Sequence, residues 1–314
     1  MIGRWLVAAG LALAAPLAAP STAFAATPDA AALKQEQDWN LRLWRVTSRI
    51  AMANADSCAA TRPAYGYLAI SVSDAATPAT RDLWREALGL GAQFKVVGLM
   101  PDGPAARAGL MAGDLLAVVG QVPWSPELAQ RQRFEAALRE AQQSGAMRLT
   151  VERQGSVVVV DLVAQPACAV DVVLIRKATP NASTFGRRVE VNTGLLQLLD
   201  SDDELAFVVG HEMAHAVLDH TGPGKEALAR ASATRGPMER EADMLGVRMA
   251  VRAGFDPEAA ARAVAKLAHA NRGPISRLLD LHGAYMPTRE RIAFLQSEAA
   301  KAVAEEVGRP KPSR

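Results

Sequence analysis

The 314-residue chain lacks a marked excess of either charge, and it lacks long apolar runs beyond its first residues. Its formal net charge is +2 at pH 7 and no basic tract is long enough to follow a phosphate backbone, so we expect no nucleic-acid partner. After position 25, no apolar run reaches the roughly 20 residues that a membrane-spanning helix needs. Half of the residues are hydrophobic, which is enough to bury a core, and the length predicts about two domains.

The first 25 residues have the organisation of an export signal. Arg4 supplies the positive start, residues 5–19 form an apolar stretch, and Ala23-Phe24-Ala25 is a small-x-small cleavage site. No cysteine lies at the cleavage point, which argues against a lipoprotein anchor, whereas an uncleaved apolar anchor stays open. We therefore expect residues 1–25 to be a signal peptide and the mature protein to be periplasmic or secreted, with no membrane span after cleavage.

The chain has only two cysteines, Cys58 and Cys168. An even pair in an exported protein favours a disulfide, and two unpaired buried thiols are the alternative. A bridge would close a loop of about 110 residues, which the chain-entropy model values at up to ~4–5 kcal/mol. It would also join the two ends of the segment between the cysteines, as expected if that segment is an inserted domain.

The segment between the cysteines differs in character from the chain on either side. Residues 62–166 alternate short strand patterns with glycine-containing turns. Residues 26–61 and 167–308 carry mainly helical patterns, including an amphipathic helix expected at 38–55. We predict an α+β protein whose discontinuous helical domain is interrupted by a β-rich one, followed by a disordered tail at 309–314.

The motif His211-Glu-Met-Ala-His215 carries the strongest chemical signal in the chain. Ser201 followed by Glu204 has the spacing of a capping box, which predicts that a helix begins just before the apolar run that leads into the motif. Residues four apart lie on one face of a helix, roughly 5–6 Å between Cβ atoms, so the two imidazoles could share one metal ion. Glu212 would project beside them as a base. The alternative is a helix that carries two histidines by chance.

Two histidines leave a catalytic zinc site incomplete, because such sites usually have three protein ligands and an open water position. The metzincin pattern is excluded, since Leu218 and Thr221 stand where it requires glycine and a third histidine. His220 is one residue away from that last position. We expect it to point elsewhere on the helix, in a structural role.

A carboxylate from a second helix is the expected third ligand. Glu239 and Asp243 are four apart and share a helix face. Glu239 could then bind the metal while Asp243 accepts the N–H of His211 and fixes its tautomer. Glu241 is the rival ligand, but no acid stands four residues after it to orient an imidazole. We otherwise expect Glu241 to be a solvated surface acid.

These residues resemble the M48 family of zinc metallopeptidases, in which HExxH is followed by ExxxD. The resemblance is carried by residues 191–196, 203–215, 239–243 and 254–257. It implies one Zn²⁺ per chain and a mainly helical zincin-type domain with a small β-sheet, whose edge strand (here near 185–191) holds an extended substrate. Soluble periplasmic members often have a His-Pro near the C-terminal end, where this chain has Met286-Pro287, so that histidine ligand is not expected.

Residues 62–166 resemble a PDZ domain of the type found in bacterial exported proteases. The strongest part is residues 103–110 with Gly113-Asp114. The resemblance implies a peptide ligand whose C-terminal carboxylate meets backbone N–H groups and whose chain adds a strand to the sheet edge, with a helix at 131–140 as the other wall. The residues expected to bind this peptide are Tyr67, Leu68, Ala69 and Ile70. The family usually has glycine at the position of Ala69, and a scaffold with a blocked groove is the alternative.

The sequence therefore predicts a zinc-dependent metalloendopeptidase that acts on exported or misfolded envelope proteins. Zinc lowers the pKa of a bound water to about 7, and Glu212 would take its proton during attack on a peptide carbonyl. Tyr285, His282 and Arg291 are candidates for a second donor to the oxyanion. A zinc-stabilised, PDZ-containing chaperone or adaptor that cleaves little is the alternative. In a third possibility, the insert regulates access to the peptidase.

Overall fold

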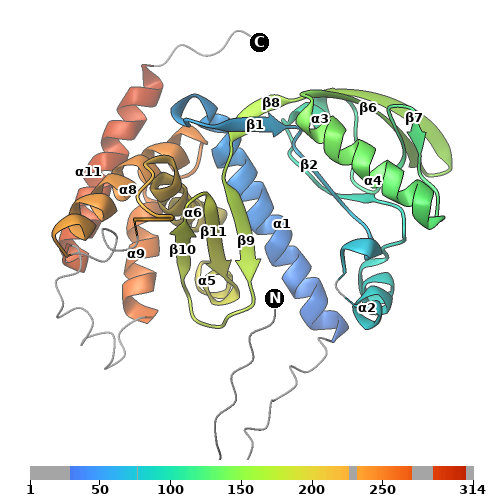
Figure 1. Cartoon of the computed structure of the whole chain (residues 1–314). Coiled ribbons are helices and arrows are strands. Elements are labelled where there is room, and N and C mark those ends of the chain that lie inside the picture. The colour runs from blue at the N-terminus through green and yellow to red at the C-terminus, as the bar shows by residue number, and fades with distance from the viewer. Residues whose placement is uncertain (1–28, 76, 226–231, 271–285, 309–314) are drawn as a thin grey trace, which may run out of the picture.

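The computed structural model describes residues 29–75, 77–225, 232–270 and 286–308. The predicted signal peptide, the C-terminal tail, His282 and Tyr285 lie outside these residues. A mainly helical part and a β-rich part lie side by side, with the long helix α1 (Ala30–Ala53) between them (Figure 1). The predicted α+β class is thus confirmed. Within the described residues, no helix is both long enough and apolar enough to cross a membrane.

The helical part is built around one buried helix, α6. Its helices are α1, α5 (Thr193–Leu198), α6 (Asp202–Val217), α8 (Ser232–Arg252), α9 (Ala259–Ala270) and α11 (Thr288–Val307). Helix α6 packs against α1, α8 and α9, and its apolar residues are buried on nearly all sides, as expected of a central helix. Ser201 caps it by accepting the N–H of Glu204 at 3.2 Å, while the Glu204 carboxylate reaches the N–H of Asp200 at 3.1 Å.

A three-stranded sheet lies against α6. Its strand order is β10 (Ala182–Phe185), β11 (Arg188–Asn192) and β9 (Asp171–Ile175), with β10–β11 antiparallel and β11–β9 parallel. The edge strand beside α6 was expected near 185–191, and this is wrong because Gly186, at φ 58°, turns the chain after Phe185. The segment after that turn becomes the central strand β11, and β10 becomes the edge.

The β-rich part has its own sheet and its own core. Its elements are β2 (Tyr67–Ile70), α2 (Pro78–Leu88), β3 (Lys95–Leu99), α3 (Pro104–Arg107), β4 (Leu115–Val119), β5 (Val122–Pro123), α4 (Leu128–Gln143), β6 (Ala146–Arg153) and β7 (Ser156–Val163). The sheet order is β2-β3-β4-β6-β7, with β5 paired to β4. Phe134, Leu116 and Leu149 are fully buried in a cluster separate from the core of the helical part. Each part therefore buries an apolar core of its own.

A two-stranded ribbon joins the two parts. Strands β1 (Thr61–Ala64) and β8 (Gln165–Cys168) pair antiparallel, with Thr61 opposite Cys168. The boundaries predicted at 62 and 166 fall inside this ribbon. Cys58 and Cys168 are bonded at its base, with Cα atoms 5.5 Å apart, so the expected disulfide is present at the neck.

Helix α1 contacts both parts. Leu43, Val46 and Ile50 are buried in the core of the helical part. The same helix contacts β3 and α2 of the β-rich part. At Gly98 in β3, an added Cβ would lie 2.8 Å from the Trp44 ring, so only glycine permits this contact. The two parts are thus packed directly together as well as tethered.

Candidate metal centre

The two histidines of the HExxH motif lie on one face of α6, where each is 8% exposed. Their Nε2 atoms are 3.2 Å apart. Helix α8 approaches this point very closely, because a Cβ on Gly246 would lie 2.7 Å from the Cα of His211. On the facing helix, a Cβ on Gly210 would lie 2.8 Å from the Gly246 carbonyl oxygen. Glycines facing each other thus bring the two helices together at the site.

This close approach brings Glu239 of α8 to the imidazoles. Its Oε2 lies 3.4 Å from Nε2 of His211 and 3.9 Å from Nε2 of His215. Around a tetrahedral zinc ion with bonds of about 2.0–2.2 Å, ligand atoms are about 3.3–3.6 Å apart. The observed separations fit one such ion after a small side-chain adjustment. Among the residues described, these three form the one His/Cys/Asp/Glu group able to hold a metal.

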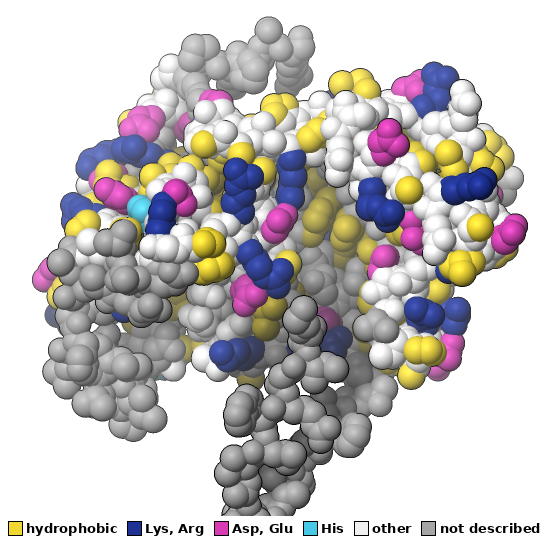
Figure 2. All heavy atoms as spheres, viewed as in Figure 1, with side chains coloured by type: hydrophobic (Ala, Val, Ile, Leu, Met, Phe, Trp, Pro, Cys, Tyr) yellow, Lys and Arg dark blue, Asp and Glu magenta, His cyan; other side chains and the backbone are white. Residues whose placement is uncertain are grey.

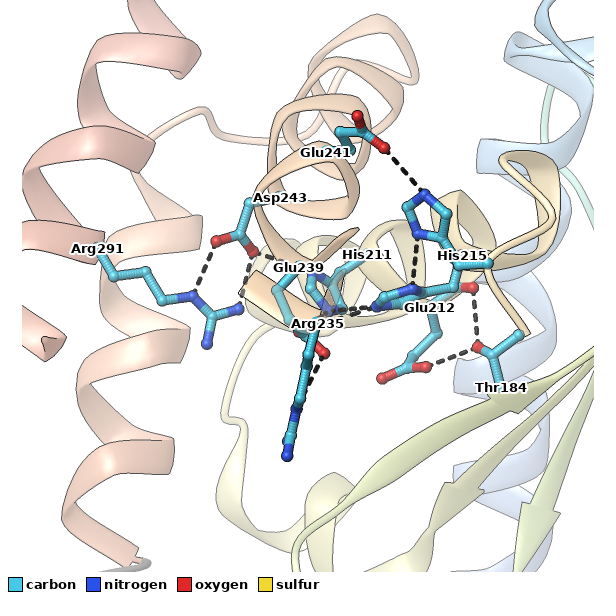
Figure 3. A network of polar contacts seen from close by, with 10 residues as sticks. Thr184, His211, Glu212, His215, Arg235, Glu239, Glu241, Asp243 and Arg291 are labelled. Atoms are coloured by element: carbon cyan, nitrogen blue, oxygen red, sulfur yellow. Dashed lines mark hydrogen bonds and ion pairs between the residues drawn. The ribbon is translucent and has the colours of Figure 1, made fainter. Parts of the chain in front are cut away.

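Asp243 contacts His211 at the position from which the spacing of the acids predicts that it could orient the imidazole. Its Oδ1 lies 2.9 Å from Nδ1 of His211, and the carboxylate is fully buried. Arg291 of α11 donates to both oxygens of Asp243, at 2.9 and 2.8 Å, from the side away from His211 (Figure 3). Arg291 was a candidate oxyanion donor, but its guanidinium is committed to Asp243. Arg291 therefore holds the carboxylate that contacts His211.

The charges in this cluster shift one another's pKa values. Burial opposes a charge on His211, but Asp243 and Glu239 outweigh it and raise the pKa of His211 to about 9. Burial also opposes the charge on Asp243, yet His211 and Arg291 lower its pKa to about 2. The pKa of Glu239 falls well below its ordinary value, against burial, because both imidazoles face it. Without a metal, His211 therefore holds a proton that a metal would displace.

Glu212 points toward the edge strand. The hydroxyl Oγ1 of Thr184 in β10 lies 2.6 Å from Oε2 of Glu212 and 2.9 Å from its backbone oxygen (Figure 3). Both residues line a cavity of about 650 Å³ together with His211, His215 and Glu239. Thr184 was not identified from the sequence, because nothing local to it signals that it contacts α6.

His220 does not point away, contrary to the prediction. Its Nδ1 lies 3.1 Å from Nδ1 of His215, and its Nε2 lies 3.1 Å from Oε2 of Glu241. The prediction continued the helix through position 220, whereas α6 ends at Val217 and Asp219 turns the chain with φ 56°. Glu241 is exposed at the surface, as expected, with 61% of its side chain accessible, and its carboxylate also contacts His220.

The residues proposed to bind a peptide lie in β2, at the edge of the larger sheet. In the described part of the chain, β2 pairs with β3 alone, and the pairing register shifts between Leu68 and Ala69. Tyr67 lines a cavity of about 440 Å³ at the junction of the two parts. Trp44 of α1 and Arg139 near the end of α4 form other walls of this cavity.

Residues 147–229 match the model of Peptidase family M48. The predicted resemblance to this family is confirmed over that segment. The M48 match covers about a quarter of the chain and contains His211, Glu212 and His215. It begins in β6 and ends before Glu239 and Asp243, so these two acids are placed at the site by the geometry above.

Similar solved structures include PDZ domains of HtrA proteins. The HtrA3 PDZ domain bound to a phage-derived ligand is 17% identical, with a TM-score of 0.25 over 34% of this chain and 88% of that one. The HtrA-type protease AlgW with a decapeptide is 27% identical, with a TM-score of 0.23 over 34% of this chain and 30% of that one. This chain thus spans less than a third of the AlgW chain. No curated protein matches the sequence.

Proposed function

We propose that this protein is a zinc-dependent metalloendopeptidase. The observation that supports it is the convergence of His211, His215 and Glu239 from two helices, with nitrogen and oxygen separations of 3.2, 3.4 and 3.9 Å. Three protein ligands leave a corner for water, which is the pattern of catalytic rather than structural zinc sites. The M48 match over the HExxH segment also supports a peptidase.

Each neighbouring side chain has a defined task in this proposal. Zinc, when bound, would polarise a peptide carbonyl and acidify a water molecule. Glu212 is the general base, which takes a proton from the attacking water and gives it to the leaving amine. Thr184 holds the Glu212 carboxylate beside the edge strand. Asp243 holds the proton of His211 on Nδ1, which leaves Nε2 free to bind the metal.

The edge strand β10 is the proposed support for substrate. Residues 181–184 line the cavity beside the metal centre, and β10 pairs with β11 on its other side. An edge strand presents unpaired backbone N–H and C=O groups, which an extended peptide can meet as an added strand. We therefore propose extended or unfolded polypeptide as the substrate class.

We place this activity outside the cytoplasm. The first 25 residues have the pattern of an export signal, and the Cys58–Cys168 disulfide suits an oxidising compartment. Lys and Arg side chains are interspersed with Asp and Glu over the face seen in Figure 2, in keeping with the small net charge. Exported or misfolded envelope proteins are the substrates we propose.

The β-rich part is proposed to bind peptide C-termini through β2. Arg139 is exposed and lines the junction cavity, so it can meet a terminal carboxylate. Tyr67 and Trp44 offer apolar surface to a last side chain. Fluorescence anisotropy with a peptide ending in valine should show binding that Arg139→Gln and amidation of the peptide each weaken. Arg133→Gln, an exposed change on the same helix, is the matched control.

The deciding test compares wild type with Glu212→Gln. Wild type should contain one zinc per chain and digest casein, and a chelator should abolish the digestion. Glu212→Gln should keep its zinc and lose about 10²–10⁴-fold of the rate. If wild type binds zinc but digests nothing while still suppressing aggregation of unfolded proteins, the chaperone or adaptor alternative replaces the peptidase.

A further inference from the structure

We propose that His220 and Glu241 form a second orienting relay, which fixes the tautomer and position of His215. This inference rests on the proposed metal site. It assigns a role at the site to two residues that the sequence placed outside it, His220 as a structural residue and Glu241 as a solvated acid. Each of the two histidines would then have its own partners, Asp243 and Arg291 for His211 and the proposed relay for His215.

The relay depends on how α6 ends. The N–H of His220 donates to the carbonyl of His215 at 3.0 Å, and Asp219 between them has a left-handed φ of 56°. This bond is the longer-range of the two that form a Schellman turn, in which the backbone reverses at the helix end. Aspartate is among the few side chains that tolerate this conformation. The reversal carries the His220 imidazole back over the last turn of α6, where it is buried against His215.

The direction of each hydrogen bond follows from the metal site. The Nε2 of His215 faces the Nε2 of His211 and Glu239, so it must carry a lone pair to bind a metal. The proton of neutral His215 then lies on Nδ1 and is donated to Nδ1 of His220, 3.1 Å away. His220 therefore carries its own proton on Nε2 and donates it to the Glu241 carboxylate at 3.1 Å. Only this set of tautomers satisfies every contact.

The relay assigns a separate task to each acid of one helix. On α8, Glu239 faces the metal position, Asp243 accepts from His211, and Glu241 accepts from His220. Without the His220 acceptor, the Nδ1–H of His215 would be buried without a partner, which is costly. Loss of such an outer partner typically weakens metal binding 10–100-fold.

The test measures zinc affinity by competition with a chromophoric chelator. His220→Leu removes both contacts and should weaken binding 10–100-fold, and Glu241→Leu should weaken it less. His220→Asn keeps an acceptor near the position of Nδ1 and should restore much of the affinity. His269→Leu, which changes an exposed histidine on α9, should bind zinc as wild type does.

A second readout reports the tautomers directly. Imidazole nitrogen NMR of zinc-loaded wild type should show a protonated Nδ1 on His215 and a protonated Nε2 on His220. A protonated Nδ1 on His220, or wild-type zinc affinity in folded His220→Leu, would overturn the relay. If His220→Leu does not fold, His220→Asn and Glu241→Leu decide the matter by the same measurements. If wild type binds no zinc at all, the metallopeptidase proposal fails instead.

Discussion

The hydroxyl of Thr184 lies 2.6 Å from Oε2 of Glu212, so the strand proposed to support substrate also holds the proposed base. The bond links β10 to α6 in the wall of the cavity. Its single proton is shared between the carboxylate and the backbone oxygen of the same glutamate. The orientation of Glu212 therefore depends on the position of the edge strand.

Replacing Thr184 with valine should lower kcat about 10–100-fold while KM changes little. A hydrogen bond to a charged group contributes about 1.5–3 kcal/mol, and valine keeps the shape of threonine without the donor. Thr184→Ser keeps the hydroxyl and should retain most of the activity. Steady-state kinetics on a fluorogenic peptide would measure both constants. An equal loss in the serine and valine variants would show that the hydroxyl is not responsible.

The shifted pKa values of His211 and Asp243 should make the metal-free protein most stable between about pH 4 and 6.5. The pKa of His211 is raised from 6.5 to about 9, so its contribution is fully present below 6.5 and is lost as pH rises through about 9. The pKa of Asp243 is lowered from 3.8 to about 2, so its contribution is present above 3.8 and is lost as pH falls through about 2. Urea unfolding with a chelator at pH 6 and pH 9 would measure the difference, which Asp243→Asn should reduce.

Zinc affinity should rise between pH 6.5 and 9. The metal must displace the proton held on His211, and that proton is held less firmly as pH approaches its raised pKa. Competition titrations at several pH values, with buffer ionisation accounted for, would show the slope and the release of a proton. A flat profile over this range would contradict the protonation of His211 in the metal-free protein.

Arg291→Leu should destabilise the protein by about 3–5 kcal/mol, because it leaves the fully buried Asp243 carboxylate without its guanidinium partner. Arg289→Leu, an exposed change two residues earlier on α11, should have little effect. Chemical unfolding of the metal-free forms would compare them. A small loss in Arg291→Leu would mean that the remaining contacts of Asp243, including the one with His211, are sufficient to hold its charge.

Gly246→Ala should separate α6 from α8 and weaken zinc binding together with stability. The added Cβ would lie 2.7 Å from backbone atoms of His211, which cannot yield without moving the helix. Gly236→Ala is the matched control, because a Cβ there meets nothing within 4 Å on the same helix. Zinc competition and thermal unfolding of both variants would check this. Wild-type behaviour of Gly246→Ala would mean that the helices can shift without cost to the site.

The sequence could predict the features that follow from the regular spacing of residues within one helix. The spacing of His211 and His215 fixes their common helix face, and that of Glu239 and Asp243 does the same on α8. His220 could not be placed in this way, because its position depends on where α6 stops and on a left-handed residue before it. Thr184 gave no local signal at all, since its contact with Glu212 arises only when the sheet packs on α6.

The β1–β8 ribbon has a consequence for how such a protein can be built. The N–H of Ala169 donates to the carbonyl of Ala60 at 3.0 Å, so the chain leaves the helical part and re-enters it at neighbouring points. A tight turn could connect these two points of the helical part as readily as the β-rich part does. Replacing the β-rich part with another domain at this ribbon would leave the backbone path of the helical part unchanged.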